Sequence, residues 1–319
     1  MVEPSSSVIE VDRDYRDCYP RHDVPAGTYL PGLVLQWCEF AMIDLHVHTN
    51  ISDGTLSPEE VVRLAAAKGI RAIAVTDHDT VSGIARAQAE GLSAGVEIVP
   101  GLEVSTQWEH GILHVLGYFM DPHDTYLIRT LDYLRQGRQE RIPKIIEKLR
   151  QCSVEISEGE VYEESVGGVP GRPHVANVLV QKNYAKTLQD AFDRYLKRGA
   201  PAYVEKTKLP MYEAMRVISA SGGLPVLAHP HSLNENDANR LETFVRDLQN
   251  HGLKGIEVYY SAHSAEQTEL YLNLATRLSL AVTGGTDFHG SNRPGIELGR
   301  LPCGKLLPYS LLENLKNRL

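Results

Sequence analysis

The sequence contains little cysteine, and it lacks the long apolar runs that would indicate a membrane protein. Its four cysteines lie far apart among 319 residues and include no Cys-x-x-Cys pair. We therefore expect neither disulfides nor a thiolate zinc site, and a reducing cytoplasmic location. No apolar run reaches the roughly eighteen residues that a membrane-spanning helix needs, so no membrane association is expected.

Two kinds of enzyme chemistry also lack their usual motifs. The sequence has no serine or cysteine nucleophile motif, and no glycine-rich loop followed by Lys-Ser or Lys-Thr. Covalent catalysis and work driven by nucleotide hydrolysis are therefore not expected. The net charge of −9 argues against binding to long duplex DNA, because its phosphates repel an acidic protein. A small anionic substrate, held by metal ions and a few local cations, remains compatible with this charge.

From Met42 onwards, apolar strand-like segments alternate with helix-like ones. Residues 70–75 form an almost wholly apolar run, typical of a parallel strand that is covered on both faces. Ser57 begins a capping box with proline at the first helical position. About seven such strand–helix units predict an α/β barrel whose site lies at the C-terminal ends of the strands.

The alternation is interrupted between residues 125 and 199, where helical periodicity dominates. We therefore expect a barrel made of residues 42–124 and 200–319, with residues 125–199 as a mostly helical insertion or cap. Residues 1–41 are expected to be an N-terminal extension upstream of a working protein that starts near Met42. A genuine extra N-terminal arm is the alternative.

The first half of the insertion is basic, although the protein as a whole is acidic. Its cations are Arg135, Arg138, Arg141, Lys144, Lys148 and Arg150. One interpretation is a solvated helix face on which Glu140 and Glu147 form i,i+3 or i,i+4 pairs. The other is a cap that lines an anion site. The sequence leaves both interpretations open.

Histidine and acidic residues recur on or just after the expected strands. His46 and His48 are two residues apart on the first strand, so their imidazoles point to the same face. The nine candidate metal ligands are His46, His48, Asp53, His78, Glu103, His114, His229, Asp287 and His289. Nitrogen and oxygen ligands without thiolates suit zinc, manganese or iron. Nine ligands exceed the needs of one ion, so we expect two or three ions, with Glu103 able to bridge two of them.

Five segments resemble the motifs of the PHP (polymerase and histidinol phosphatase) superfamily of metal-dependent phosphoesterases. They are His-Val-His-Thr-Asn-Ile-Ser-Asp-Gly, Thr-Asp-His-Asp, Gly-Leu-Glu-Val-Ser, Ala-His-Pro and Gly-Thr-Asp-Phe-His, and they lie within residues 42–290. Asp53 stands where histidinol-phosphatase-type members tend to carry a histidine. The sequence most resembles the nucleoside 3′,5′-bisphosphate phosphatases, also described as 5′→3′ exoribonucleases, because of Asp53 and the segment Gly171-Arg172-Pro173-His174.

The resemblance implies a distorted (β/α)7 barrel with a trinuclear centre, often loaded with manganese, with zinc and iron as alternatives. By matching motif positions, the first ion would be held by His46, His48, Glu103 and Asp287. Glu103 would bridge to a second ion held by His114 and His229. The third ion would be held by Asp53, His78 and His289. The residues in contact with the substrate phosphate, and expected to take part in catalysis, would be Arg172, His174 and His231.

Three further acidic residues are candidates for supporting roles. Asp77 and Asp79 are expected to orient His78 or its neighbours. Glu257 is either a further acid of this kind or an ordinary polar residue of its strand.

The activity implied by the resemblance is hydrolysis of the 3′-phosphate of nucleoside 3′,5′-bisphosphates, for example adenosine 3′,5′-bisphosphate to AMP and phosphate. Trimming of short RNA from the 5′ end is a related expectation, so the expected partners are small nucleotides and the 5′ ends of short RNA. Two alternatives stay open: a phosphatase of another small phosphomonoester such as histidinol phosphate, and a catalytically silent, metal-stabilised binding module. The oligomeric state is not predicted.

Overall fold

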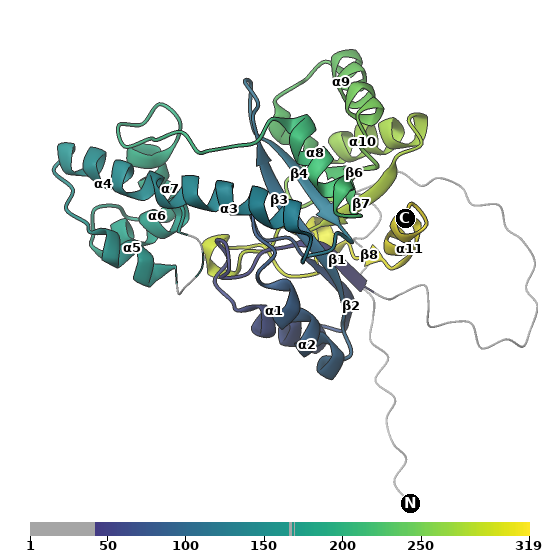
Figure 1. The fold of residues 1–319 in the computed structure, drawn as a ribbon, viewed down its shortest axis with the longest axis horizontal. Helices are drawn as coiled ribbons and strands as arrows, with labels where there is room; N and C mark the ends of the chain where they lie inside the picture. The colour runs from purple at the N-terminus through teal and green to yellow at the C-terminus, as the bar shows by residue number, and fades with distance from the viewer. Residues whose placement is uncertain (1–41, 166–167, 169) are drawn as a thin grey trace, which may run out of the picture.

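A mixed β-sheet forms the centre of the protein in a computed structural model that describes residues 42–165, 168 and 170–319 (Figure 1). Its strands are β1 (Met42–Val47), β2 (Ile70–Val75), β3 (Glu97–Thr106), β4 (Leu113–Tyr118), β5 (Leu224–Leu227), β6 (Gly255–Tyr260), β7 (Ala281–Gly285) and β8 (Leu307–Pro308). Their order across the sheet is β7-β6-β5-β4-β3-β2-β1-β8. The expected extension of residues 1–41 lies outside the described residues.

The sheet curls until its first and seventh strands meet. The His48 backbone N–H donates to the Phe288 carbonyl oxygen at 2.9 Å, and the Asp287 N–H donates to the His46 carbonyl oxygen at 2.9 Å. A parallel bridge joins Val47 and Phe288 at the same place. The short β8 pairs only with the start of β1, so it does not prevent this closure. The expectation of a distorted α/β barrel is therefore confirmed.

The distortion comes mainly from β4, which runs against both of its neighbours. β3 pairs with β4, and β4 with β5, in antiparallel fashion, whereas β1–β2–β3 and β5–β6–β7 are parallel. The connection of residues 107–112 is too short for a parallel crossover, so it forms a hairpin. Because of this direction β4 begins, rather than ends, at the edge where the parallel strands end.

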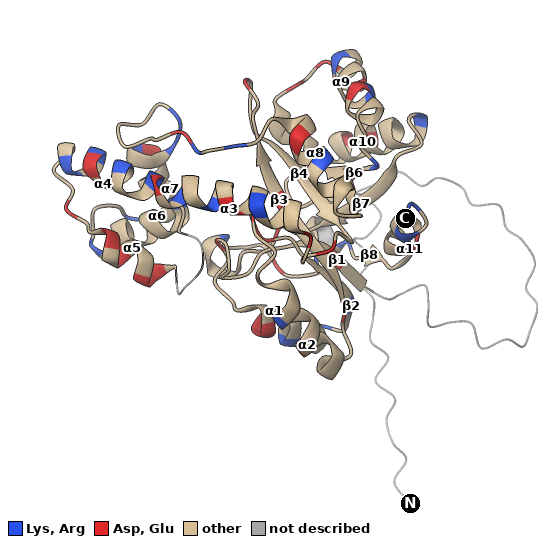
Figure 2. Cartoon of the chain, in the orientation of Figure 1, with Lys and Arg blue, Asp and Glu red and all other residues tan. Residues whose placement is uncertain are grey.

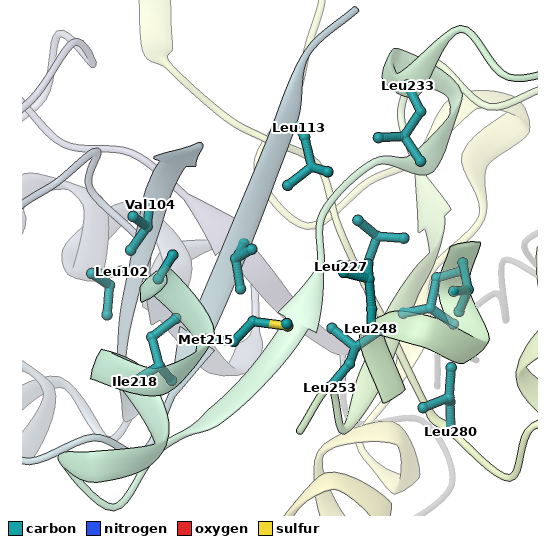
Figure 3. Packing of buried hydrophobic residues seen from close by; sticks show 14 of the residues in the cluster. Leu102, Val104, Leu113, Met215, Ile218, Leu227, Leu233, Leu248, Leu253 and Leu280 are labelled. Carbon is teal, nitrogen blue, oxygen red and sulfur yellow. The ribbon is translucent and has the colours of Figure 1, made fainter. Parts of the chain in front are cut away.

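Helices cover the outside of the sheet (Figure 1). Those packed around the barrel are α1 (Pro58–Ala67), α2 (Ile84–Ala94), α8 (Met211–Ala220), α9 (Ala238–Asn250), α10 (Ala265–Arg277) and α11 (Ser310–Lys316). In Figure 3, Ile218 of α8 lies on the side of Leu102 of β3, and Met215 points toward Leu227 of β5; all belong to one large buried apolar cluster. Such packing fixes the positions of the strands and thereby of the side chains at their ends.

The helical insertion extends from the barrel at the end of β4. It contains α3 (Thr125–Gln139), α4 (Arg141–Gln151), α5 (Glu158–Glu164), α6 (Arg172–Gln181), α7 (Leu188–Ala191) and the π-helix η2 (Phe192–Leu196). Leu127 and Leu134 of α3 belong to the apolar cluster of the barrel, whereas Ile142 and Val175 belong to a separate cluster within the insertion. The domain boundaries at residues 125 and 199 stay a prediction.

The distribution of basic residues and the character of the helices bear on what the protein can contact. Lys and Arg residues occur along α3 and α4 and in the chain that leads into α8 (Figure 2). Within the described part of the chain, no helix is long and apolar enough to cross a membrane.

Candidate metal centre

All nine predicted metal ligands gather at one edge of the barrel. His46 and His48 lie on or just after β1, Glu103 on β3 and His114 near the start of β4. The remaining five, Asp53, His78, His229, Asp287 and His289, come from loops that follow strands. The antiparallel direction of β4 brings its first residues to this edge, which explains how His114 joins ligands from the ends of parallel strands.

Four of these side chains present atoms at the spacing of a metal coordination shell. The Nε2 atom of His46 lies 3.1 Å from the Nε2 of His48, 3.4 Å from Glu103 Oε2 and 3.3 Å from Asp287 Oδ1. His48 Nε2 lies 3.2 Å from Glu103 Oε2 and 3.1 Å from Asp287 Oδ1. Ligands at ~2.0–2.1 Å from one ion stand about 3.3 Å apart in a tetrahedron, so this set fits a transition metal.

Hydrogen bonds from residues outside this ligand set orient two of its side chains, His46 and Asp287. Glu257 Oε1 accepts from His46 Nδ1–H at 2.9 Å, which leaves the His46 Nε2 lone pair directed at the other ligands. The Oδ2 atom of Asp287 accepts from the Tyr260 hydroxyl at 2.7 Å and is also paired with Arg293. The other oxygen, Oδ1, is buried without a hydrogen-bond partner among the described residues. An orphaned carboxylate oxygen and a fixed imidazole tautomer both fit a metal site.

Glu103 joins this set to the remaining histidines. Its Oε1 lies 2.6 Å from His114 Nδ1 and 2.9 Å from His229 Nε2. Its Oε2, which faces His46 and His48, also lies 3.1 Å from His78 Nδ1. One carboxylate therefore contacts imidazoles with both of its oxygens, the arrangement of a bridging ligand.

Asp53 and His289 complete the cluster on the other side of His48. Asp53 Oδ1 lies 3.2 Å from His289 Nε2 and 3.7 Å from His48 Nδ1. Asp53 Oδ2 lies 3.8 Å from His78 Nε2. These four residues form a second group that could hold an ion, and His78, Glu103 and His114 form a third. The structure thus supplies three overlapping groups, while the assignment of each ligand to one ion stays a prediction.

The charges in the cluster depend on one another. Burial acts to raise the pKa of the Glu103 carboxyl, but the imidazoles of His114 and His78 outweigh it and hold that pKa well below its usual range. Burial opposes a proton on His48, yet Asp287 and Glu103 raise its pKa to about 10. Without a cation, a protonated imidazole therefore balances the carboxylates. Metal binding must displace this proton, so it should depend on pH.

Several residues at this edge have backbone φ angles in the left-handed region. The φ angles of Asp79, His229 and Asp287 are 54°, 24° and 57°. Such angles are unfavourable for residues other than glycine, and they cluster at functional sites. Here they turn the chain sharply after a strand, which directs the ligands inward.

The two acids expected to orient His78 contact its neighbours instead of its ring. Asp77 accepts from the Thr49 backbone N–H at 2.8 Å and from the Ser52 hydroxyl at 2.6 Å, which holds the loop between His48 and Asp53. Asp79 accepts from the Ser105 backbone N–H at 2.8 Å.

Asp79 also pairs with two cations, the buried Arg138 at 2.7 Å to Nη2 and the partly buried Lys206 at 2.8 Å to Nζ. Sequence reasoning missed Lys206, as it missed Tyr260 and Arg293, and it left Glu257 undecided. The only available signal for Glu257 was a single acid in the otherwise apolar strand β6.

Two cavities open from the metal ligands. The first, of about 600 Å³, is lined by ligands such as His229 and Asp287 together with His231, Tyr260 and Arg293. The second, of about 470 Å³, extends from Asp53, His78 and His114 to the basic residues of the insertion. Both volumes fall in the ~300–1,000 Å³ range of small-molecule sites.

The three predicted substrate residues take different positions. His231 lines the first cavity, and its Nδ1 has no hydrogen-bond partner in the described structure. Arg172 lines the second cavity, where its Nη1 donates to the Leu196 carbonyl oxygen at 2.9 Å. His174 is buried, and its Nδ1 accepts from the Gly171 backbone N–H at 2.9 Å. The structure therefore brings Arg172 and His231 to the cavities, while the His174 ring holds the start of α6.

Comparison with known proteins identifies the family. The PHP domain model matches residues 44–207, about half of the chain. This protein belongs to the PHP domain family. It is 33% identical over 262 residues to the 3′,5′-nucleoside bisphosphate phosphatase of Chromobacterium violaceum, covering 81% of this chain and 91% of that protein. It is 34% identical over 279 residues to the 5′-3′ exoribonuclease Rnm of Escherichia coli, covering 86% and 94%.

A solved structure supports the same conclusion. An amidohydrolase from C. violaceum with bound sulfate superposes with a TM-score of 0.75 at 31% identity, covering 86% of this PHP chain and 97% of that chain. The predicted resemblance to PHP phosphoesterases is confirmed, and so is the expectation of a hydrolase of phosphoester bonds.

Proposed function

We propose that this PHP protein removes the 3′-phosphate from nucleoside 3′,5′-bisphosphates and also trims short RNA from its 5′ end. The observation that carries the proposal is the cluster of histidine and acidic metal ligands. Three of its members, Asp53, His78 and His114, line a cavity whose other walls carry lysine and arginine side chains. The names of its relatives point to the same two substrates. Small nucleotides and short RNA in the cytoplasm are thus the proposed partners, rather than long duplex DNA.

The chain's donor set suits three manganese ions, with zinc or iron as alternatives. The first would be held by His46, His48, Glu103 and Asp287, the second by Glu103, His114 and His229, and the third by Asp53, His78 and His289. When bound, such ions supply an activated water at neutral pH and neutralise charge on the phosphate.

The protein's own side chains would position the substrate. His231 lies beside His229 and lines the first cavity, where its ring would contact the phosphate or the departing ribose oxygen. Arg172 offers a guanidinium to a phosphate in the second cavity. His174 would act through the Gly171 backbone, by fixing the turn that carries Arg172. Direct contact between His174 and the substrate stays a prediction.

Phosphate release from adenosine 3′,5′-bisphosphate with added Mn²⁺ tests this function. Adenosine 5′-monophosphate and histidinol phosphate serve as parallel substrates. We expect rapid conversion of the bisphosphate to AMP, with little turnover of the other two. Activity on histidinol phosphate but not on the bisphosphate would retain the metal chemistry and refute the substrate. No turnover of any phosphoester by the manganese-loaded protein would favour the binding module.

A further inference from the structure

An asparagine that follows β7 joins the helical insertion to the loop that carries Asp53. Asn292 lies in the 3₁₀ helix η4 (Gly290–Asn292) and lines the first cavity. Its side-chain Nδ2 donates to the Asp53 backbone carbonyl oxygen at 2.8 Å, and its Oδ1 accepts from Asn177 Nδ2 of α6 at 3.1 Å. Because the Asp53 carbonyl can only accept, it fixes the orientation of the Asn292 amide, and both ends of that amide are used.

The Asp53 loop is also bonded to the segment that carries His289. The Thr55 backbone N–H donates to the His289 carbonyl oxygen at 3.2 Å, and the Ser291 N–H donates to the Thr55 hydroxyl at 3.0 Å. Asp53 Oδ1 lies 3.2 Å from His289 Nε2. These two candidate ligands therefore lie on segments that are bonded to each other, and Asn292 attaches both segments to α6.

The insertion meets the ligand edge of the barrel at a second point, beside His78. There Arg138 of α3 pairs with Asp79, the residue that directly follows His78. One attachment of the insertion thus holds the neighbour of His78, and the other holds the backbone of Asp53.

Both attachments lead to the same group of candidate ligands, which consists of His48, Asp53, His78 and His289. Within the described part of the chain, the insertion forms no hydrogen bond or ion pair with His46, Glu103 or Asp287. The insertion is therefore attached to the ligands of one group and not to these three.

The group to which the insertion is attached is also the more widely spaced. Asp53 Oδ2 lies 3.8 Å from His78 Nε2, and Asp53 Oδ1 lies 3.7 Å from His48 Nδ1. Around His46 Nε2 the corresponding distances are 3.1–3.4 Å, close to the ~3.3 Å expected around one ion. Asp53 must approach His48 and His78 to share an ion with them. The affinity for that ion therefore depends on where the rest of the protein holds the Asp53 loop.

We propose that Asn292 is a positioning residue through which the docked insertion sets the affinity of the metal ion held by His48, Asp53, His78 and His289. This inference rests on the metal assignment in the proposed function, but not on its substrate. Pro173, at the start of α6, lines both cavities. A molecule that shifts α6 from there would change the affinity for the ion, and the ion would change the affinity for that molecule by the same factor.

Calorimetric titration of Mn²⁺ into the chelator-treated full chain tests the proposal by comparing Asn177→Ala with Asn273→Ala. Both asparagines lie inside helices, but Asn273 of α10 is exposed, so it controls for the gain in helix propensity. Asp53→Asn identifies the binding step of the ion in question, because it removes one of its ligands. At that step the dissociation constant should rise roughly 2- to 10-fold in Asn177→Ala, the range for losing a neutral hydrogen bond. Asn273→Ala should bind Mn²⁺ as wild type does.

A double variant shows whether Asn177 acts through Asp53. Asn177→Ala should add no further loss of Mn²⁺ affinity to Asp53→Asn, because the ligand that it positions is already gone. A further loss would overturn the proposal. A lower unfolding temperature of the metal-free Asn177→Ala variant with unchanged Mn²⁺ binding would also overturn it, because the bond would then serve only the stability of the fold.

The same titrations separate this inference from the metal assignment on which it rests. A loss of affinity in Asp53→Asn but not in Asn177→Ala refutes the inference alone. Wild-type Mn²⁺ binding by Asp53→Asn refutes the metal assignment, and the inference with it. Should Asn177→Ala not fold, Asn292→Ala breaks the same link from the other side, and unchanged Mn²⁺ binding in that variant would refute the positioning role.

Discussion

Replacing Glu257 with glutamine should weaken metal binding by His46 without changing any predicted metal ligand. Glu257 is fully buried; Oε1 accepts from His46 Nδ1 at 2.9 Å, and Oε2 accepts from the His229 backbone N–H at 2.7 Å. Glutamine keeps one oxygen and replaces the other with an NH2 group. Since the His229 backbone can only donate, the remaining oxygen should turn toward it and leave the NH2 group facing His46.

An amide donor at this position reverses the tautomer of His46. Nδ1 would become the acceptor, and the proton would move to Nε2, the atom that lies 3.1–3.4 Å from the other three ligand atoms. Loss of such an outer partner lowers metal affinity about 10- to 100-fold. This factor corresponds to ~1.4–2.7 kcal/mol of binding free energy.

Calorimetric titration of Mn²⁺ into chelator-treated protein measures this loss directly. Thermal unfolding in a fixed Mn²⁺ concentration gives a second readout, because a weaker ligand stabilises the folded state less. Glu269→Gln makes the same substitution at an exposed position of α10 and should change neither quantity. If Glu257→Gln folds and binds Mn²⁺ as tightly as wild type, the tautomer argument is wrong.

Three further perturbations test other parts of the site. Asp287→Asn should reduce phosphate release by more than ~100-fold, because losing a metal ligand has a larger effect than losing a residue that only orients a ligand. The circular dichroism spectrum should stay unchanged, because asparagine tolerates the φ of 57° at this position. Gly285→Ala should lower the free energy of unfolding in urea by about 1–3 kcal/mol, because its Cβ would collide with His46. Gly159→Ala should not, because its Cβ would meet only the Ser157 hydroxyl oxygen at 3.9 Å, an ordinary van der Waals contact. Burial lowers the pKa of Lys206 to about 8, so its charge is lost as the pH rises through that value, and the KM for substrate should then increase. Lys206→Met should show the higher KM already at neutral pH, with no further increase near pH 8.

Features set by local contacts could be predicted from the sequence. The two-residue spacing of His46 and His48 predicted a shared face, and their Nε2 atoms meet at 3.1 Å. The capping box at Ser57 forms with both of its hydrogen bonds, 2.8 Å to the Glu60 carboxylate and 3.2 Å from the Glu60 N–H. In each case the deciding atoms lie within one turn or one pleat of each other.

Features set by distant contacts could not be predicted in this way. Glu257 meets His46 across 211 positions of sequence, and a single acid in an apolar strand has no spacing that identifies its partner. Tyr260 and Arg293 hold Asp287 from two other segments. The direction of β4 is a different case: its apolar pattern has the same period both ways, and only the short connection of residues 107–112 indicates the antiparallel pairing.

The basic residues of the insertion show why one pattern allowed two interpretations. Arg138 and Arg141 are each 6% exposed and face the second cavity. Arg135 and Arg150 are exposed and pair within their own helices, with Asp132 and Glu147. The basic residues therefore divide into a solvated group and a buried group that lines the cavity, and anion binding by the second group stays a prediction. Periodicity could not separate them, because the residues that bury Arg138 and Arg141 come from the barrel and from the chain after η2.

Asp79 explains how the insertion stays in place over the metal centre. It directly follows the ligand His78, yet its carboxylate pairs with Arg138 of α3 and with Lys206 of the chain that leaves the insertion. Moving the insertion away would separate the buried Asp79–Arg138 pair, which costs far more than breaking a surface pair. The same pairing offsets the unfavourable φ of 54° at Asp79. One carboxylate against two cations also leaves an excess of positive charge in the wall of the second cavity, which Arg138 and Lys206 line together with the metal ligands Asp53, His78 and His114.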